Sequence, residues 1–249
     1  MKINLTNTTF VIPVKIDSTK RLFNLNLIID YLLNYFDTNI IVGEEGSNKC
    51  KNIGDKCLYY SFNYNINFFH RTRLLNDLYK LCDTEVICNY DSDVLLEVDK
   101  YTKSTDIISN GEFDVVFPYS GIFYDVREQY HQTIRNKLSI DFLSGLRHHI
   151  RNHMSVGGAI FFNKESLFDV GLENENFKSW GYEDLERIYR FEKMGYRITR
   201  LNGNLYHLVH PKGSDSNKNN VFYESNRLEL EKIKAMSKNE LIKYIGIKR

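Results

Sequence analysis

Apolar residues recur along the chain with two periods that alternate. Residues 9–14 form a short, β-branched apolar run that ends at a proline, as expected of a buried strand. Over residues 20–36, leucine, isoleucine and phenylalanine recur every three or four positions, which is the spacing of a helix. Residues 39–43 form a second apolar run. A strand, a helix and a strand in this order predict the opening of a parallel α/β sheet.

The same periods continue towards the C-terminus. They predict helices over 69–81 and 183–194 and strands over 84–90, 113–118, 157–162 and 196–201. The helix over 183–194 ends at Gly195, a common residue after a last helical turn. Residues 127–153 are polar and basic and show no clear period. Together these patterns predict one α/β domain with a mostly parallel central sheet flanked by helices.

Composition narrows the class of protein. The 249 residues carry a formal net charge of +1, which offers no argument for a nucleic-acid partner. Four cysteines form no CxxC pair and fit a reducing compartment, so a cytoplasmic location is expected. No apolar stretch reaches the roughly 18 residues of a membrane span.

Two carboxylates follow the strand predicted over 84–90. Asp91 and Asp93 flank Ser92 at its carboxyl end, where ligands bind in open α/β sheets. Such a pair can hold a divalent cation, and the cation can neutralise a diphosphate. Chance alone produces about one DxD tripeptide in a chain of this composition, so a polar turn is the competing interpretation.

Two histidines follow the strand that precedes a proline and a Gly/Ser/Asn-rich loop. His207 and His210 have a spacing that chance produces only about 0.2 times in this chain. Imidazole is a good ligand for transition metals. The alternative is one core histidine and one surface histidine.

The single tryptophan stands before an acidic helix start. Trp180 can stack on a sugar ring, and Glu183 or Asp184 can take the proton of an attacking hydroxyl. Acidic residues also favour the first turn of any helix because of its dipole, and an isolated tryptophan is more often core.

Two further segments carry ambiguous signals. Arg71, at the start of the helix over 69–81, faces an unfavourable helix dipole and can fork onto phosphate, although a solvated face is an alternative. The pair Gly157 and Gly158 allows backbone to approach a ligand, but a turn or bulge fits equally well. The histidines and arginines of 147–153 are interpreted as a solvated or acceptor-facing basic patch.

Taken together, these segments resemble the β-1,4-galactosyltransferase family of GT-A glycosyltransferases and its bacterial chondroitin-polymerase-like relatives. Residues 69–76 resemble the family's FNRAKLLN, residues 91–93 match its DVD, and residues 157–165 resemble its GGVSALSKE. Residues 180–184 match WGGED except that Tyr182 replaces the second glycine, and 207–210 fall where the family has its last metal ligands. The order agrees from residue 9 to about 213.

The resemblance implies roles for individual residues. Asp93, His210 and His207 would hold Mn²⁺ or Mg²⁺, Asp184 would be the catalytic base and Glu183 would hold the acceptor. The residues that the resemblance places around the donor are Pro13, Val14, Phe69, Arg71, Asp91, Ser92, Gly158 and Trp180.

The resemblance also implies an activity: inverting, metal-dependent transfer of a Gal- or GalNAc-type sugar from a UDP-sugar to a saccharide hydroxyl. Apart from the resemblance, a cytoplasmic enzyme without a membrane span could act on a lipid-linked precursor in surface polysaccharide synthesis, and the basic tail and the 127–153 patch could contact the inner face of a membrane. An ordinary solvated helix is the alternative interpretation of the tail. The expected catalytic domain is 1–220, with a donor half over 1–120, an acceptor and metal half over 150–220, and a loop over 211–220 that closes on the donor. Residues 221–249 are expected to form an amphipathic helix.

Two other functions are compatible with parts of the sequence. A nucleotidyltransferase acting on sugar phosphates would share the sheet and the carboxylates, but such enzymes usually carry a glycine-rich loop after the first strand, and none follows Val14. A non-catalytic UDP-sugar-binding module would share the binding residues without turnover.

Overall fold

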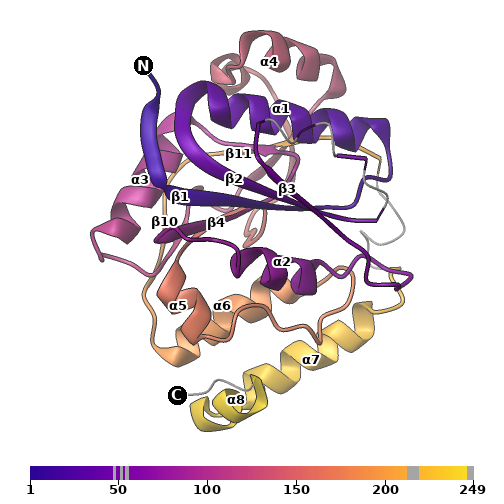
Figure 1. Ribbon diagram of the computed structural model, residues 1–249, viewed down its shortest axis with the longest axis vertical. Coiled ribbons are helices and arrows are strands. Elements are labelled where there is room, and N and C mark those ends of the chain that lie inside the picture. The colour runs from indigo at the N-terminus through magenta and orange to yellow at the C-terminus, as the bar shows by residue number, and fades with distance from the viewer. Residues whose placement is uncertain (47–48, 51–52, 54–55, 212–218, 246–249) are drawn as a thin grey trace.

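The computed structural model describes residues 1–46, 49–50, 53, 56–211 and 219–245. In this part of the chain, two sheets and their helices form one α/β assembly (Figure 1). The larger sheet has seven strands in the described residues. In spatial order they are β10 (Ile198–Arg200), β6 (Val115–Phe117), β9 (Ala159–Asn163), β4 (Val86–Tyr90), β1 (Ile3–Val14), β2 (Phe36–Glu45) and β3 (Leu58–Phe62).

The larger sheet is mostly parallel, which confirms the predicted fold class. β1 runs parallel to β2 and β4, β2 runs parallel to β3, and β10 runs parallel to β6. Only β9 runs antiparallel to its neighbours, β4 and β6, among the pairings of the described strands. The strand β9, which comes late in the chain, is therefore inserted between two strands from the first 120 residues.

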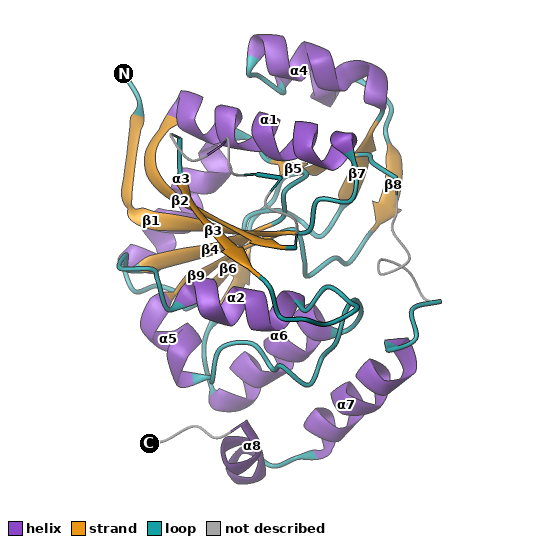
Figure 2. Cartoon of the chain, turned by 45° about the vertical axis from the view of Figure 1, so that its right-hand side comes forward, coloured by secondary structure: helices purple, strands orange, loops and turns teal. Residues whose placement is uncertain are grey.

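Helices pack on both faces of this sheet (Figures 1 and 2). α1 (Thr19–Tyr35) and α3 (Val98–Ser109) cover one face, and α4 (His131–Lys137) packs on α1. α2 (Arg71–Tyr79), α5 (Lys164–Asp169) and α6 (Glu183–Met194) cover the other face. The alternation of β1 explains both layers, because Phe10 and Ile12 join one core cluster while Val11 joins the other.

The described residues also form a second, four-stranded sheet. Its strands, in order, are β5 (Val94–Leu95), β11 (Leu205–Leu208), β7 (Phe123–Val126) and β8 (His149–Asn152). The segment 127–153, which shows no clear period in the sequence, supplies β8, α4 and two short 3₁₀ helices at Glu128–Tyr130 and Asp141–Gly145. The edge strand β8 is exposed along its length.

The C-terminal segment differs from the single helix expected over 221–249. It forms two helices, α7 (Tyr223–Ala235) and α8 (Lys238–Ile245), because the backbone at Met236 is extended and ends α7. Lys193 of α6 anchors α7 by donating hydrogen bonds to the carbonyl oxygens of Ile233 and Lys234 at 2.7 and 2.8 Å. Residues 212–218, within the loop expected to close on a donor, and 246–249 lie outside the described residues.

Candidate active site

One cavity of about 1000 Å³ lies at the carboxyl ends of β1 and β4, where ligands bind in open α/β sheets. The strands bring motifs from distant parts of the chain to this edge. Every site residue that the sequence analysis singled out lines this cavity: Pro13, Val14, Phe69, Arg71, Asp91, Ser92, Asp93, Gly158, Trp180, Glu183, Asp184, His207 and His210. Their individual roles stay predictions.

Backbone pairing brings Asp93 beside the histidines. Asp93 leads directly into β5, which pairs antiparallel with β11 so that Val94 faces His207. The N–H of Leu208 donates to the carbonyl oxygen of Asp93 at 2.8 Å. The two short strands therefore bring Asp93 next to the end of β11, which carries His207.

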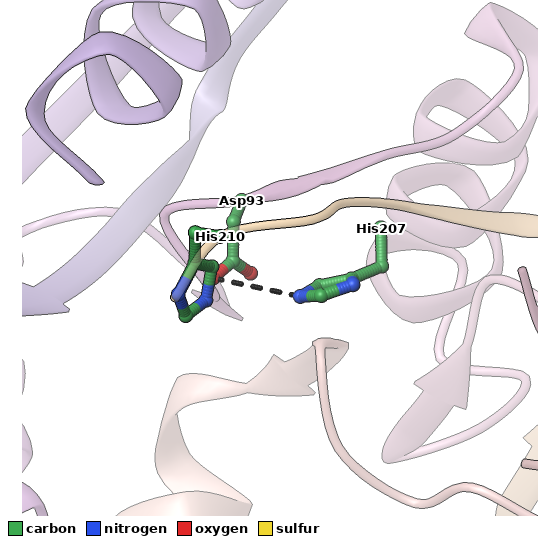
Figure 3. Close-up of side chains that lie close together, drawn as sticks. All are labelled: Asp93, His207 and His210. Atoms are coloured by element: carbon green, nitrogen blue, oxygen red, sulfur yellow. Dashed lines mark ion pairs between the residues drawn. The ribbon is translucent and has the colours of Figure 1, made fainter. Parts of the chain in front are cut away.

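Asp93, His207 and His210 form a compact set of possible metal ligands (Figure 3). Asp93 Oδ2 lies 2.8 Å from His210 Nε2 and 3.9 Å from His207 Nε2, and one ligand atom from each residue lies within 4.8 Å of the others. The Nδ1 of His210 contacts the carbonyl oxygen of Pro211 at 2.7 Å, so both ring nitrogens of His210 face an oxygen atom. One carboxylate and two imidazoles fit a divalent transition metal such as Mn²⁺.

Positive groups surround the carboxylate of Asp93. Arg21, in the first turn of α1, places Nη1 3.9 Å from Asp93 Oδ2. Burial by itself would raise the pKa of Asp93, but His207, His210 and Arg21 lower it well below its ordinary value. Asp93 is therefore ionised, as a carboxylate ligand of a metal would have to be. Sequence reasoning missed Arg21, since an arginine on a helix carries no signal without its tertiary neighbours.

Arg71 links the first aspartate of the DxD motif to the acidic helix start. Its Nη2 donates to Asp91 Oδ1 at 2.8 Å and to Asn89 Oδ1 at 3.2 Å, and its Nη1 lies 3.5 Å from Asp184 Oδ1. Burial disfavours the charged guanidinium, yet Asp91 and Asp184 raise the pKa of Arg71 above its ordinary value. This arginine stays charged at the floor of the cavity.

The first turn of α6 presents the two acidic residues. Tyr182 precedes the helix in the left-handed region (φ 71°), where a side chain other than glycine is strained. The N–H of Gly181 donates to Glu183 Oε2 at 2.8 Å, while the buried Arg187 pairs with Asp184. Burial, followed by the charge of Asp184, raises the pKa of Glu183 to about 7.

The two glycines before β9 are required for different reasons. Gly158 has a positive φ of 84°, and an added Cβ would lie 2.9 Å from both Leu205 Cδ1 and Phe123 Cε2. At Gly157, an added Cβ would collide with Asp184 Oδ2 and lie 3.3 Å from its Cγ. The backbone of Gly157 is thus one wall of the space that holds the Asp184 carboxylate.

An aromatic group forms one rim of the cavity. Trp180, the tryptophan of the acidic motif, is 39% exposed and stacks on Tyr223 of α7 with ring centroids 6.0 Å apart. Tyr182, which replaces a glycine of the family pattern, lies 5.1 Å from the Tyr223 ring, and their hydroxyls are 2.8 Å apart. Sequence reasoning missed Tyr223, because it stands in a segment interpreted only as a C-terminal helix.

The basic segment before β9 also reaches the site. His149 and His153 are exposed, as expected of a solvated patch, but Arg151 lines the cavity. Its Nη1 lies 3.0 Å from both ring nitrogens of His207. Asp125 of β7, also missed from the sequence, contacts the same imidazole.

The fold resembles that of GT-A glycosyltransferases, as solved structures show. The catalytic domain of Drosophila β1,4-galactosyltransferase 7 in complex with xylobiose is 16% identical, with a TM-score of 0.50, and the match covers 82% of this chain and 71% of that one. A mannosyltransferase from Pyrobaculum calidifontis in complex with GDP-Man and Mn²⁺ is 16% identical, with a TM-score of 0.54. The match covers 83% of this chain and 58% of the mannosyltransferase chain. GalNAc-T7 with UDP, GalNAc and Mn²⁺ is 13% identical, with a TM-score of 0.56. The match covers 96% of this chain and 56% of the GalNAc-T7 chain.

A family model adds a second finding. Residues 140–212 match the family described as the N-terminal domain of galactosyltransferase, a segment that includes the glycine pair, the acidic helix start and both histidines. No curated protein sequence matches the chain. The predicted resemblance is confirmed, and the family match and the fold together support a glycosyltransferase. None of the helices in the described part of the chain combines the length and apolar character that a membrane span requires.

Proposed function

We propose that this protein is a metal-dependent, inverting glycosyltransferase that moves a Gal- or GalNAc-type sugar from a UDP-sugar to a saccharide hydroxyl. One observation carries the proposal. The ligand set of Asp93, His207 and His210 lines the same cavity as the carboxylate of Asp184. A site for a nucleotide diphosphate and a candidate general base thus share one space.

The donor would lie along the carboxyl ends of β1 and β4. Mn²⁺ or Mg²⁺, when bound, would neutralise the diphosphate and so stabilise UDP as a leaving group. Arg71 and Phe69 would contact the nucleotide, because both line the cavity beside Asp91. Structural neighbours hold either UDP or GDP-Man. The choice of UDP therefore rests on the galactosyltransferase resemblance rather than on the fold.

Asp184 is the candidate base. It lies in the first turn of α6, its side chain is 27% exposed, and Arg71 and Arg187 hold it in place. As a base it would take the acceptor's proton while the acceptor oxygen attacks the anomeric carbon and the bond to UDP breaks. Positioned proton transfer contributes about 10²–10⁴-fold to rate. Glu183 would position the acceptor hydroxyl.

The acceptor would approach from the aromatic rim. Trp180 and Tyr223 offer apolar ring surface for the C–H face of a sugar, next to Glu183 and Asp184. The exposed strand β8 places further positive charge at the same mouth, which favours an anionic acceptor such as a lipid-linked saccharide diphosphate. We propose that class of acceptor for a role in surface polysaccharide synthesis.

The test is UDP release from a panel of UDP-sugars with saccharide acceptors, with and without Mn²⁺. Asp184→Asn should lower turnover by about 10²–10⁴-fold while UDP-sugar affinity is retained. Asp37→Asn changes an exposed carboxylate on β2 and serves as the matched control. Release of pyrophosphate from UTP and a sugar phosphate would instead indicate a nucleotidyltransferase. Tight UDP-sugar binding without turnover on any acceptor would indicate a binding module.

A further inference from the structure

A carboxylate outside the proposed ligand set lies against one of its histidines. Strand pairing aligns His207 of β11 with Asp125 of β7, and Asp125 with His149 of β8. Asp125 Oδ1 is 2.8 Å from His207 Nδ1, and Asp125 Oδ2 is 3.2 Å from His149 Nδ1. One aspartate therefore bridges a buried imidazole and an exposed one across three adjacent strands.

The contact determines which nitrogen of His207 can bind a cation. A carboxylate only accepts hydrogen bonds, so His207 must carry its proton on Nδ1 to donate to Asp125. The lone pair is then on Nε2, the nitrogen that faces Asp93 Oδ2 at 3.9 Å (Figure 3). His207 is 5% exposed and packs against the Phe123 ring, so its orientation is restricted.

Arg151 contacts the same imidazole. A guanidinium has no acceptor, so it can hydrogen-bond to His207 only through a ring nitrogen without a proton. Its Nη1 is 3.0 Å from both ring nitrogens of His207, so the tautomer follows from the Asp125 contact and not from Arg151. Nη1 is also 3.7 Å from Asp125 Oδ1, so the aspartate partly balances its charge. Without Asp125, the Arg151 guanidinium would lie beside His207 with no carboxylate on β7 to balance its charge.

We propose that Asp125 is a positioning residue for the cation site: it holds His207 in the Nδ1–H tautomer, directs Nε2 towards Asp93 and offsets the charge of Arg151. It does not touch the cation or the substrates. Carboxylates that accept from the distal nitrogen of a ligating histidine raise metal affinity by about 10- to 100-fold in other metal sites. The inference rests on the proposed function, because it presumes that Asp93, His207 and His210 bind a divalent metal.

The experiment measures Mn²⁺ affinity of the full chain by calorimetry, with Mn²⁺ alone as the ligand. Asp125→Asn keeps the size of the side chain and should weaken Mn²⁺ binding about 10- to 100-fold, and Asp125→Ala should weaken it at least as much. His149→Ala is the matched control, because it removes the exposed histidine partner of Asp125 without touching His207, and it should leave the affinity unchanged.

A second readout separates positioning from a general loss of structure. Nitrogen-15 NMR of the ring should show His207 as the Nδ1–H tautomer in the native protein, with that preference lost in Asp125→Ala at unchanged circular dichroism. If His210→Ala abolishes Mn²⁺ binding while both Asp125 variants bind like the native chain, only this inference fails. If His210→Ala binds Mn²⁺ normally, the proposed cation site itself is wrong. An Nε2–H tautomer in the native chain would also overturn the inference.

Discussion

Gly157→Ala offers a direct test of the candidate base, because it adds one methyl group against Asp184. Gly157 has no positive φ, so alanine is compatible with its backbone and the effect is purely steric. The new Cβ would collide with Asp184 Oδ2 and lie 3.3 Å from Cγ. The carboxylate is confined on its other side by Arg71 and Arg187, so it cannot simply rotate away without losing an ion pair.

The expected magnitude follows from the required movement. Relief of the collision needs a shift of about 1 Å, because ordinary contacts between non-bonded heavy atoms are about 3.5–4.0 Å long. A misplacement of about 1 Å in a reacting geometry can lower the rate about 10²-fold. Such a loss equals about 2.7 kcal/mol in activation free energy. Donor affinity should change little, because the proposed cation ligands do not touch Gly157.

The assay is the initial rate of UDP release at saturating donor. Gly145→Ala is the matched control, since a Cβ there meets nothing within 4 Å of the described residues and that glycine also lacks a positive φ. In an Asp184→Asn background, Gly157→Ala should have only a small further effect, because the group that it displaces no longer acts as a base. Full turnover by Gly157→Ala, or fully additive losses in the double variant, would refute the assignment of Asp184.

Two predictions concern stability. Because the folded-state pKa of Glu183 is raised from 4.5 to about 7, the native state binds the proton more tightly and the native chain loses stability as pH rises through that range. Glu183→Gln should therefore be more stable than the native chain at pH 8, by up to about 3 kcal/mol, and the difference in unfolding free energy should be smaller at pH 5. Urea denaturation at both pH values measures this difference. The same difference at pH 5 and pH 8 would contradict the prediction. Lys193→Met removes charged hydrogen bonds to the carbonyl oxygens of Ile233 and Lys234 and should lower the free energy of unfolding by about 1–3 kcal/mol. Thermal unfolding measures the loss, and Lys80→Met, at the exposed end of α2, is the control.

Local periodicity was sufficient to predict the helices and strands whose apolar positions repeat most regularly. The helix predicted over 183–194 has those bounds in the structure, because it begins after a left-handed residue and Gly195 ends it with φ 90°. The helix predicted over 20–36 is α1, with Ser18 accepting from the N–H of Arg21 as its cap. The β3 strand was not predicted, although its aromatic residues favour a strand.

The candidate site was predictable as a set of residues but not as a geometry. The DxD motif, the glycine pair, the acidic helix start and the two histidines all line one cavity of the structure. Arg21, Asp125 and Tyr223 were not predicted for the site, since each is a common residue type in an unremarkable local sequence. Arg151 was predicted only as a member of a solvated or acceptor-facing basic patch. Their part in it arises from neighbours far away in the chain.

The sequence by itself determined the elements whose apolar positions repeat with a helical or strand period, and it identified the motifs that stand at their ends. The tertiary structure alone decided that β9 runs antiparallel in an otherwise parallel sheet, and that β5, β11, β7 and β8 form a second sheet. Strand pairing of this kind depends on packing between segments distant in sequence, and no local period encodes it. For that reason the contact between Asp125 and His207, 82 residues apart, becomes visible only in the folded chain.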